Sequence, residues 1–337
     1  MSTIATTLSL LIACSGKSPP QDSSQTTETG VQDTAVELNW SVGVENAPEG
    51  AFLSAWGVDP MDVWVVGGQA EAGLVLRGSQ ATWIPHSLPE GTPLLNWIHG
   101  TAANDIWTGG LNGTLLHWNG NEWTDYSVDI DEAFWGIYAN SSSDIVAVGG
   151  ESRWGGSQGR IFHYDGSTWS EQALPSEVAS VSNLFKVTHD GTQYWIVGVG
   201  GTVLKGNGTE FSAVPTGTAT DLITIHHNAN RTQIVGGRGT GVVIDIESEA
   251  LGSPTQAVAG LNGVYVLDET RSFVVGERGY GAFYEAGAFS ELTSITLDVL
   301  HAAFVSNDDT IYAVGGNLFT SDPTFHGTIL YHSPTQQ

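Results

Sequence analysis

The chain has 337 residues, and its 36 acidic side chains outnumber its 10 lysines and arginines, so that the formal net charge is −26. Such a surface repels nucleic-acid phosphates and anionic lipid headgroups and attracts cations or basic partners, although a solvated acidic surface that only keeps the protein soluble has the same charge. We therefore expect no nucleic-acid partner. The 43 glycines and 12 tryptophans are typical of an all-β repeat protein whose turns need positive φ.

Residues 1–13, MSTIATTLSLLIA, form an uncharged and mostly apolar run that ends at the single cysteine, Cys14. The run is too short for a permanent transmembrane helix, but it suffices for the apolar part of an export signal. The stretch Leu11-Ile12-Ala13-Cys14 resembles the lipobox of bacterial lipoproteins, and this resemblance implies a signal peptide at 1–13 and a lipid on Cys14. The alternative is an ordinary N-terminus with an incidental thiol. A single cysteine allows no disulfide within the chain.

Residues 14–36 hold the cysteine and then mainly Ser, Thr, Gln, Pro and Asp, a composition that cannot offset the entropy of ordering. We expect a flexible tether there. By the same resemblance, Ser15 after the cysteine favours sorting to the outer membrane. The predicted location is therefore the bacterial outer membrane or cell surface, with the membrane contacted through the lipid anchor.

From residue 37 onward the chain repeats, and each unit has a glycine that ends its second predicted strand. These glycines are Gly67, Gly110, Gly149, Gly198, Gly236, Gly276 and Gly315. Their spacings are 43, 39, 49, 38, 40 and 39 residues. A period near 40 with four short strands per unit is typical of a β-propeller, and seven units predict seven blades over residues 37–337.

The other strands of each unit follow in order. Third strands begin at Gly73, Gly113, Gly159, Gly201, Gly241, Gly281 and Gly327, and fourth strands begin around Trp83, Trp123, Trp169, Phe211, Pro254 and Phe289. The seventh unit lacks a fourth strand, and Leu38-Asn39-Trp40-Ser41-Val42 has the form of one. We predict that this N-terminal strand completes the last blade and closes the ring, which removes exposed sheet edges.

Aromatic residues recur in the first two strands of several units. First strands hold Trp56, Trp97, Trp135 and Phe185, and second strands hold Trp64, Trp107 and Trp195. A buried aromatic side chain hides roughly 150–250 Å². We interpret these residues as wedges that join blade to blade and not as a platform for stacking sugars.

Gly149-Gly150, Tyr164 and Trp169 resemble a kelch repeat, and Asp165-Gly-Ser-Thr-Trp169 is similar to the Asp-box of sialidase-type propellers, though one residue shorter. With Trp56-Gly57 ahead of Asp62-Val63-Trp64, residues 37–332 look like tandem-propeller lipoproteins of the Asp-box (BNR) or photosystem-assembly-factor-like kind. The resemblance implies the fold and leaves the function open, because propellers host many activities.

Motifs that could carry catalysis or bind a cofactor are unconvincing. Gly155-Gly-Ser-Gln-Gly159 matches a nucleophile elbow, but a strand follows it instead of a helix. His226 and His227 are adjacent in a strand and point to opposite faces, so they could not readily share a metal ion. His117 and His163 lie on separate blades. We predict no catalytic residues, no metal and no cofactor, although Asp129, Asp131 and Glu132 could offer ligands to a structural Ca²⁺ as an alternative to a solvated acidic loop.

Loops from second to third strands share one face of a propeller with the loops between blades. They hold a set of charged and aromatic residues that we predict as a binding face: Glu151, Arg153, Trp154, Arg238, Glu277, Arg278 and Tyr280. Arginine beside aromatic residues suits recognition of carboxylates or sugars, whereas local neutralisation of an acidic surface gives the same pattern.

The sequence thus predicts a lipid-anchored envelope propeller, expected to be a monomer, that acts as a non-catalytic binding or scaffolding module for a protein or glycan. One alternative is a glycan-active enzyme of sialidase or lyase type. It is disfavoured because the residues offer no arginine triad and no paired catalytic carboxylates. The other alternative is a purely structural surface protein.

Overall fold

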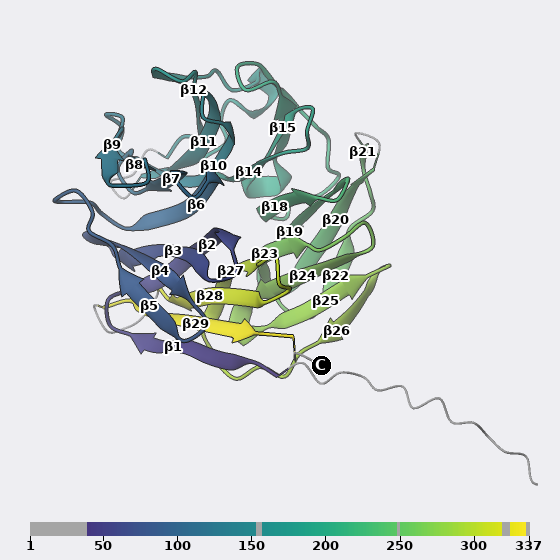
Figure 1. The fold of residues 1–337 in the computed structure, drawn as a ribbon. Helices are drawn as coiled ribbons and strands as arrows, with labels where there is room; N and C mark the ends of the chain where they lie inside the picture. Colours follow the sequence, from purple (N-terminus) through teal and green to yellow (C-terminus); the bar gives the residue numbers. More distant parts are fainter. Residues whose placement is uncertain (1–38, 153–156, 248–249, 319–323, 335–337) are drawn as a thin grey trace, which may run out of the picture. The chain divides into compact units, whose positions relative to one another are not determined.

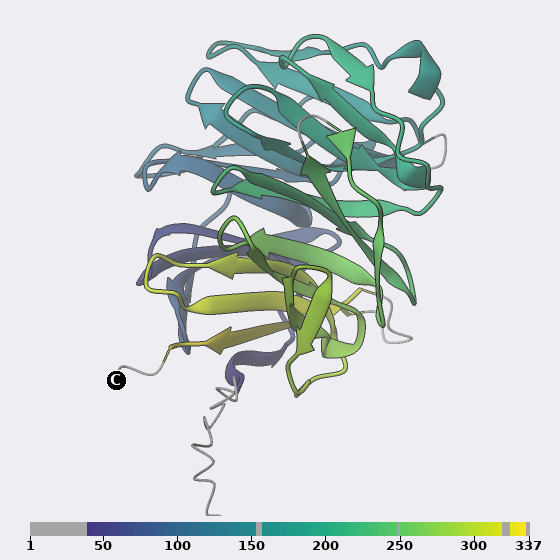
Figure 2. The same ribbon diagram turned by 90° about the vertical axis from the view of Figure 1, so that its right-hand side faces the viewer.

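The computed structural model describes residues 39–152, 157–247, 250–318 and 324–334. By its contacts the chain divides into Met1–Val36 and Glu37–Gln337, and the described residues all belong to the second unit. This unit consists of seven antiparallel sheets arranged in a ring (Figure 1). The predicted all-β, seven-bladed propeller is confirmed. Figure 2 shows the same ribbon turned by 90° about the vertical axis.

In the first six blades the strands follow chain order from the axis outward, whereas the outermost strand of the seventh blade is the N-terminal one. The first blade contains β2 Ala51–Asp59, β3 Asp62–Gln69, β4 Ala72–Ser79 and β5 Thr82–Pro85. The second contains β6 Leu95–Ala102, β7 Asp105–Gly110, β8 Leu115–Trp118 and β9 Trp123–Asp125. The third contains β10 Glu132–Ser141, β11 Asp144–Ser152, β12 Arg160–Tyr164 and β13 Trp169–Glu171.

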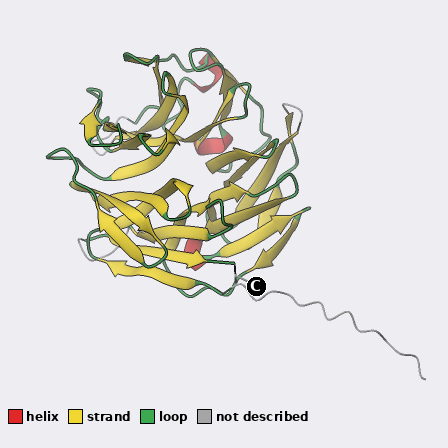
Figure 3. Cartoon of the chain, viewed as in Figure 1, coloured by secondary structure: helices red, strands yellow, loops and turns green. Residues whose placement is uncertain are grey.

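The fourth, fifth and sixth blades repeat this order. The fourth contains β14 Leu184–His189, β15 Tyr194–Gly198, β16 Val203–Gly206 and β17 Phe211–Ala213. The fifth contains β18 Leu222–Asn228, β19 Arg231–Gly236, β20 Gly241–Glu247, β21 Ala250–Leu251 and β22 Thr255–Ala257. The sixth contains β23 Leu261–Val266, β24 Arg271–Gly276, β25 Gly281–Glu285 and β26 Ala288–Glu291, and the seventh contains β27 Val299–Val305, β28 Ile311–Asn317, β29 His326–His332 and β1 Ser41–Ala47. The described residues also form three short 3-10 turns, red in Figure 3, namely η1 Ser176–Val178, η2 Val199–Gly201 and η3 Glu277–Gly279.

The N-terminal strand closes the ring as predicted. Strand β1 pairs antiparallel with the C-terminal strand β29, with Ser41 opposite Tyr331 (Figure 1). The strand covers residues 41–47 instead of the expected 38–42, because Trp40 leaves the sheet just before it and packs edge-on against Phe273 of the sixth blade, with ring centroids 5.7 Å apart. Trp40 thereby anchors the closing strand to the neighbouring blade.

Glycine recurs at the end of each second strand for a steric reason. Each of these glycines pairs with an apolar residue of its blade's first strand, as Gly67 does with Phe52. A Cβ atom at Gly67 or Gly149 would lie 1.9 Å from a carbonyl oxygen of that first strand, and one at Gly276 would lie 1.9 Å from the carbonyl oxygen of Gly260, just before its first strand. The first and second strands approach so closely there that only glycine fits, which explains why the repeat is readable in the sequence.

Tryptophans of the second strands wedge the blades together. Trp64, Trp107 and Trp195 are at most 1% exposed. Trp107 contacts Tyr164 and Trp169 of the next blade, with ring centroids 5.1 and 5.6 Å away. For these three residues the predicted role as inter-blade core holds.

The third-strand positions of His117 and His163 are structural. Each imidazole Nε2 lies 2.8 Å from a carboxylate oxygen of the second strand in its own blade, that of Asp105 or Asp144. Because each histidine is paired within its own blade, the two do not converge on one site.

Candidate functional site

The loops predicted as a binding face connect second to third strands, and the structure joins neighbouring loops by hydrogen bonds. The carboxylate of Glu277 accepts from the backbone N–H of Gly239 at 3.1 Å, which ties the loop of the sixth blade to that of the fifth. The carboxylate of Glu151 accepts from the Asn183 amide at 3.2 Å. These two acidic residues therefore position loops. Arg153 and Trp154 lie outside the described residues.

Four of the seven blades have a left-handed residue two positions after the repeat glycine. These residues are Asn112, Glu151, Gly200 and Arg278, with φ of 54°, 55°, 63° and 56°. Glycine and asparagine visit this region readily, whereas other residues pay roughly 1–2 kcal/mol for it. Glu151, near the end of β11, and Arg278, in η3, thus hold a disfavoured backbone at exposed positions, and such strain tends to occur at functional sites.

Most described arginines are engaged by carboxylates of the chain itself. The pairs within 3.0 Å are Arg77–Asp62, Arg160–Glu132, Arg160–Glu171, Arg231–Asp245 and Arg271–Asp268. By contrast, Arg238 has a 74% exposed side chain and lies 3.7 Å from Asp221. No described residue forms an ion pair with Arg278. Among the described arginines, Arg238 and Arg278 of the loop face are therefore the ones available to a partner.

A groove of about 560 Å³ lies beside Arg278, between the sixth and seventh blades. We call it the Arg278 groove, and it is lined by Glu45, Asn46, Arg278, Ser294, Ile295, Thr296, Leu297 and Asp298. Leu297 is 86% exposed and Ile295 is 48% exposed. The carboxylate of Asp298 is engaged by the side chains of His326 and Thr328. The groove therefore combines a free arginine with exposed apolar side chains.

Tyr280 mainly packs against other side chains of the propeller and is only partly exposed. Its ring packs against the buried cluster around Val235, and its hydroxyl lies 3.5 Å from a carboxylate oxygen of Glu291. Burial, together with the charge of Glu291, raises the pKa of Tyr280 to about 12. The phenol stays protonated at physiological pH, and the packing of its ring supports the loop.

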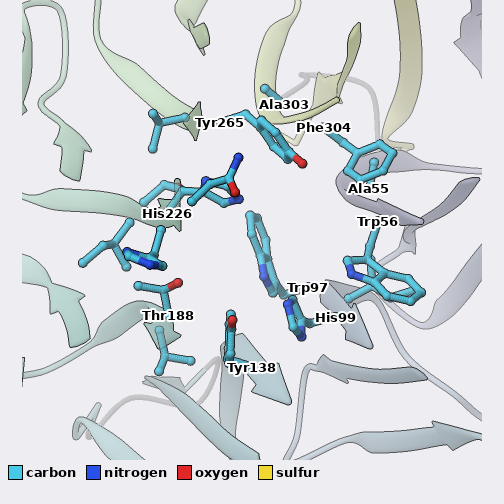
Figure 4. A pocket seen from close by; sticks show the side chains of 18 of the residues that line it. Ala55, Trp56, Trp97, His99, Tyr138, Thr188, His226, Tyr265, Ala303 and Phe304 are labelled. Carbon is cyan, nitrogen blue, oxygen red and sulfur yellow. The ribbon is translucent and has the colours of Figure 1, made fainter. Parts of the chain in front are cut away.

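A second site, which the sequence reading missed, is a cavity of about 210 Å³ on the propeller axis (Figure 4). The first strands line it, towards their turns into the second strands and so away from the loop face. Six of the seven first strands place an aromatic side chain or histidine there, four residues after the partner of the repeat glycine. These are Trp56, His99, Tyr138, His226, Tyr265 and Phe304, whereas the fourth blade has Thr188 at this position.

Two histidines of this cavity share one geometry. His99 stacks on Tyr138, and the ring of His226 is tilted by 30° against that of Tyr265, with centroids 4.1 and 4.4 Å apart. In each, Nδ1 accepts a backbone N–H of the next blade at 3.1 Å. Burial lowers the pKa of His99 to about 4 and that of His226 to about 3. Both rings are neutral at pH 7, and because Nδ1 accepts, Nε2 carries the proton.

Trp56 and Trp97 correct the sequence interpretation. Both were predicted as wedges between blades, but they are only half-buried and line the axial cavity. An alignment of the first strands would have shown the aromatic residue recurring at one position. Aromatic residues in strands usually belong to the core, so this recurrence does not by itself indicate a cavity.

The described residues contain no group of three His, Cys, Asp or Glu side chains that could hold a metal ion. At the acidic loop, Glu132 is buried and its carboxylate is bound by Arg160 at 2.9 Å, while Asp129 and Asp131 are exposed. His226 turns to the next blade, whereas the Nδ1 of His227 lies 2.8 Å from the Thr232 hydroxyl. Within the described ranges, no helix is both long and apolar enough to cross a membrane.

No protein-family model matches the chain, and no curated protein matches it. Among solved structures, YCF48 bound to D1 peptide is similar with a TM-score of 0.62 and 16% identity over 88% of this chain and 97% of that chain. YCF48 from Cyanidioschyzon merolae gives 0.63 and 14% over 88% and 99%, and the WD40 β-propeller domain of Doa1 gives 0.63 and 9% over 89% and 98%. At these identities the comparisons show a shared fold.

Proposed function

We propose that this propeller is a non-catalytic binding module that takes a segment of a partner protein on its loop face, at Arg238 and the Arg278 groove. The observation that carries the proposal is Arg278, a strained and unpaired cation beside the 86% exposed side chain of Leu297. A chain of net charge −26 offers many carboxylates for neutralisation, yet this arginine has none among the described residues.

The groove suits a segment that is both acidic and apolar. A guanidinium binds a carboxylate through two parallel hydrogen bonds, and Leu297 and Ile295 supply apolar contact next to it. Because the rest of the surface is acidic, the two arginines would select the orientation of the partner more than they would speed its approach. The YCF48 structure described as bound to D1 peptide supports peptide binding by a propeller of this kind.

A lipid anchor at Cys14 belongs to the same proposal. It rests on the lipobox-like residues 11–14 and would hold the propeller at the bacterial outer membrane through the tether of residues 14–36. Expression in a Gram-negative host tests it, by comparing intact mass and detergent partitioning of the wild type and Cys14→Ser. Acyl mass and detergent partitioning in the wild type alone are expected. If both proteins are soluble and uncleaved, the anchor is wrong while the binding proposal stands.

Affinity capture from envelope extracts tests the binding proposal. Wild type and the double variant Arg238→Glu/Arg278→Glu are compared, with Arg271→Glu as a control for the same kind of charge reversal outside the loop face. A protein captured by wild type and control but lost from the double variant is expected. Saturable binding to a glycan array, with or without turnover, in place of such a protein would instead support the glycan alternatives.

A further inference from the structure

Lys186 is a buried cation at the axis of the propeller. It lies on β14 of the fourth blade and is only 7% exposed. Its Nζ donates to the backbone carbonyl of Trp135 in the third blade at 2.6 Å and lies 4.2 Å from the ring centroid of Trp97 in the second blade. The ammonium group of Lys186 therefore contacts the first strands of two blades besides its own.

The backbone makes room for this reach. A Cβ atom at Gly136 would lie 2.8 Å from the Cα of Lys186, so the first strands of the third and fourth blades are in close contact. The pairing of β10 with β11 skips Trp135, which forms a β-bulge. A bulge leaves its residue out of the ladder, and the Trp135 carbonyl is thus free to accept from Lys186.

The ammonium is not fully satisfied. It has three donors, and one bond to a protein acceptor accounts for one of them. No carboxylate of the described residues forms a salt bridge with it, and burial lowers the pKa of Lys186 to about 7. A buried charge without a counter-ion is unfavourable in free energy, and an anion bound next to it would offset this cost.

His301 adds a second polar atom without a partner. It is the bulge residue of β27 in the seventh blade, at the level of Trp135, and its Nε2 is buried with no hydrogen bond in the described structure. Burial lowers the pKa of His301 to about 4, and the charge of Lys186 lowers it further. Asp298 acts on His301 in the opposite sense, but its carboxylate is engaged by His326 and Thr328.

From this geometry we propose that Lys186 and His301 form a binding site for a carboxylate at the inner end of the axial cavity. Trp97, Thr224 and Gly263 line that end, at the position that Lys186 has in its own strand. The carboxylate accepts from the free donors of Lys186 Nζ and from His301 Nε2, above the face of Trp97. It belongs either to a small free acid or to the end of a peptide, and the aromatic side chains around the cavity surround the remainder.

Lysine NMR tests the site directly, because the chain has only three lysines, Lys17, Lys186 and Lys205. In the full chain labelled at lysine ¹³Cε, the Lys186 signal is assigned by its loss in Lys186→Met, or by elimination with Lys17→Arg and Lys205→Arg. Its pKa is then measured with increasing acetate at constant ionic strength, with chloride as the balance. Binding to the protonated form raises that pKa by about one unit when acetate exceeds its dissociation constant tenfold.

Two further arms complete the test. Tetraglycine with a free C-terminus is compared with its amide; if the free peptide shifts the pKa at lower concentration than acetate, the source is a peptide end, and the reverse order assigns a small acid. His301→Leu is expected to weaken the acetate effect at least several-fold, whereas Lys205→Met, on an outer strand of the same blade, leaves it unchanged. A Lys186 pKa that acetate and the free peptide do not move beyond chloride would overturn the proposal.

Discussion

Arg278 of the sixth blade and Gly200 of the fourth stand at the same point of the repeat and share a left-handed backbone, with φ of 56° and 63°. Both lie in a 3-10 turn directly after the repeat glycine, η3 and η2. The fold therefore accepts glycine at this point, and the arginine is an additional feature that the turn does not require.

Arg278→Gly separates folding from binding. The variant relieves the left-handed strain, so its free energy of unfolding in urea should equal that of the wild type or exceed it by up to about 1 kcal/mol. Partner binding should fall at least tenfold, because a charge-assisted bidentate contact is lost. Arg271→Gln is the matched control, since its partner is Asp268. Unchanged binding by Arg278→Gly would remove this residue from the site.

The ring closure depends on Trp40. Trp40→Ala should lower the free energy of unfolding by about 3–5 kcal/mol, because it empties the space against Phe273 and loosens the closing strand. Val42→Ala, on the same strand but 46% exposed, should change stability by less than about 0.5 kcal/mol. Denaturant unfolding measures both. Similar losses in the two variants would mean that Trp40 does not anchor the strand.

The repeat glycines should tolerate no side chain. Gly149→Ala places a Cβ 1.9 Å from the Ala133 carbonyl oxygen, and the strands must separate to admit it. We expect a loss of more than about 3 kcal/mol, at the upper end of what single substitutions do. Gly191→Ala is the control: its Cβ meets nothing within 4 Å, and only its φ of 90° opposes the change. That variant should lose about 1 kcal/mol.

The buried histidines predict acid sensitivity. The folded pKa values of His99 and His226, about 4 and about 3, lie below the unfolded value of about 6.5, so the unfolded chain binds more protons in between. Stability is therefore complete above pH 6.5 and is lost as the pH falls towards these folded values. At pH 5 each histidine should cost up to about 2 kcal/mol.

His226→Gln tests this account, because it keeps an acceptor for Val266 but cannot be protonated. The difference in unfolding free energy between pH 7 and pH 5 should shrink by about 2 kcal/mol in this variant. Tyr265→Phe, which keeps the ring beside His226, should leave the difference unchanged. If His226→Gln also leaves it unchanged, His226 is not the group that titrates.

Much of the fold was predictable because its causes are local. A Cβ atom at any of the repeat glycines would clash with neighbouring backbone, so these positions are always glycine and the blades can be recognised from the sequence. The closing strand can be recognised because Trp40 stands in a sequence context like that of Trp83. The loop face followed from topology. The isolation of Arg278 did not, because it depends on where every carboxylate lies in space.

The axial cavity could not be predicted for a related reason. A bulge in every first strand shifts the alternation of side chains by one residue, as at Trp135 and His301, so that a strict period of two misassigns which residues face the axis. Trp56 and Trp97 then resemble Trp64 and Trp107 in the sequence. Lys186 resembles any solvated strand lysine, and its burial comes from residues on two other blades.

The most direct test of the loop face as a partner site is photo-crosslinking in cells. A benzoylphenylalanine replaces Leu297 in the Arg278 groove or, as a control, Met61, which is 70% exposed in the turn between β2 and β3. We predict a crosslinked partner protein from position 297 alone, and its disappearance when Arg278→Gly is added. Identical adducts from both positions, or an adduct that survives Arg278→Gly, would contradict the account.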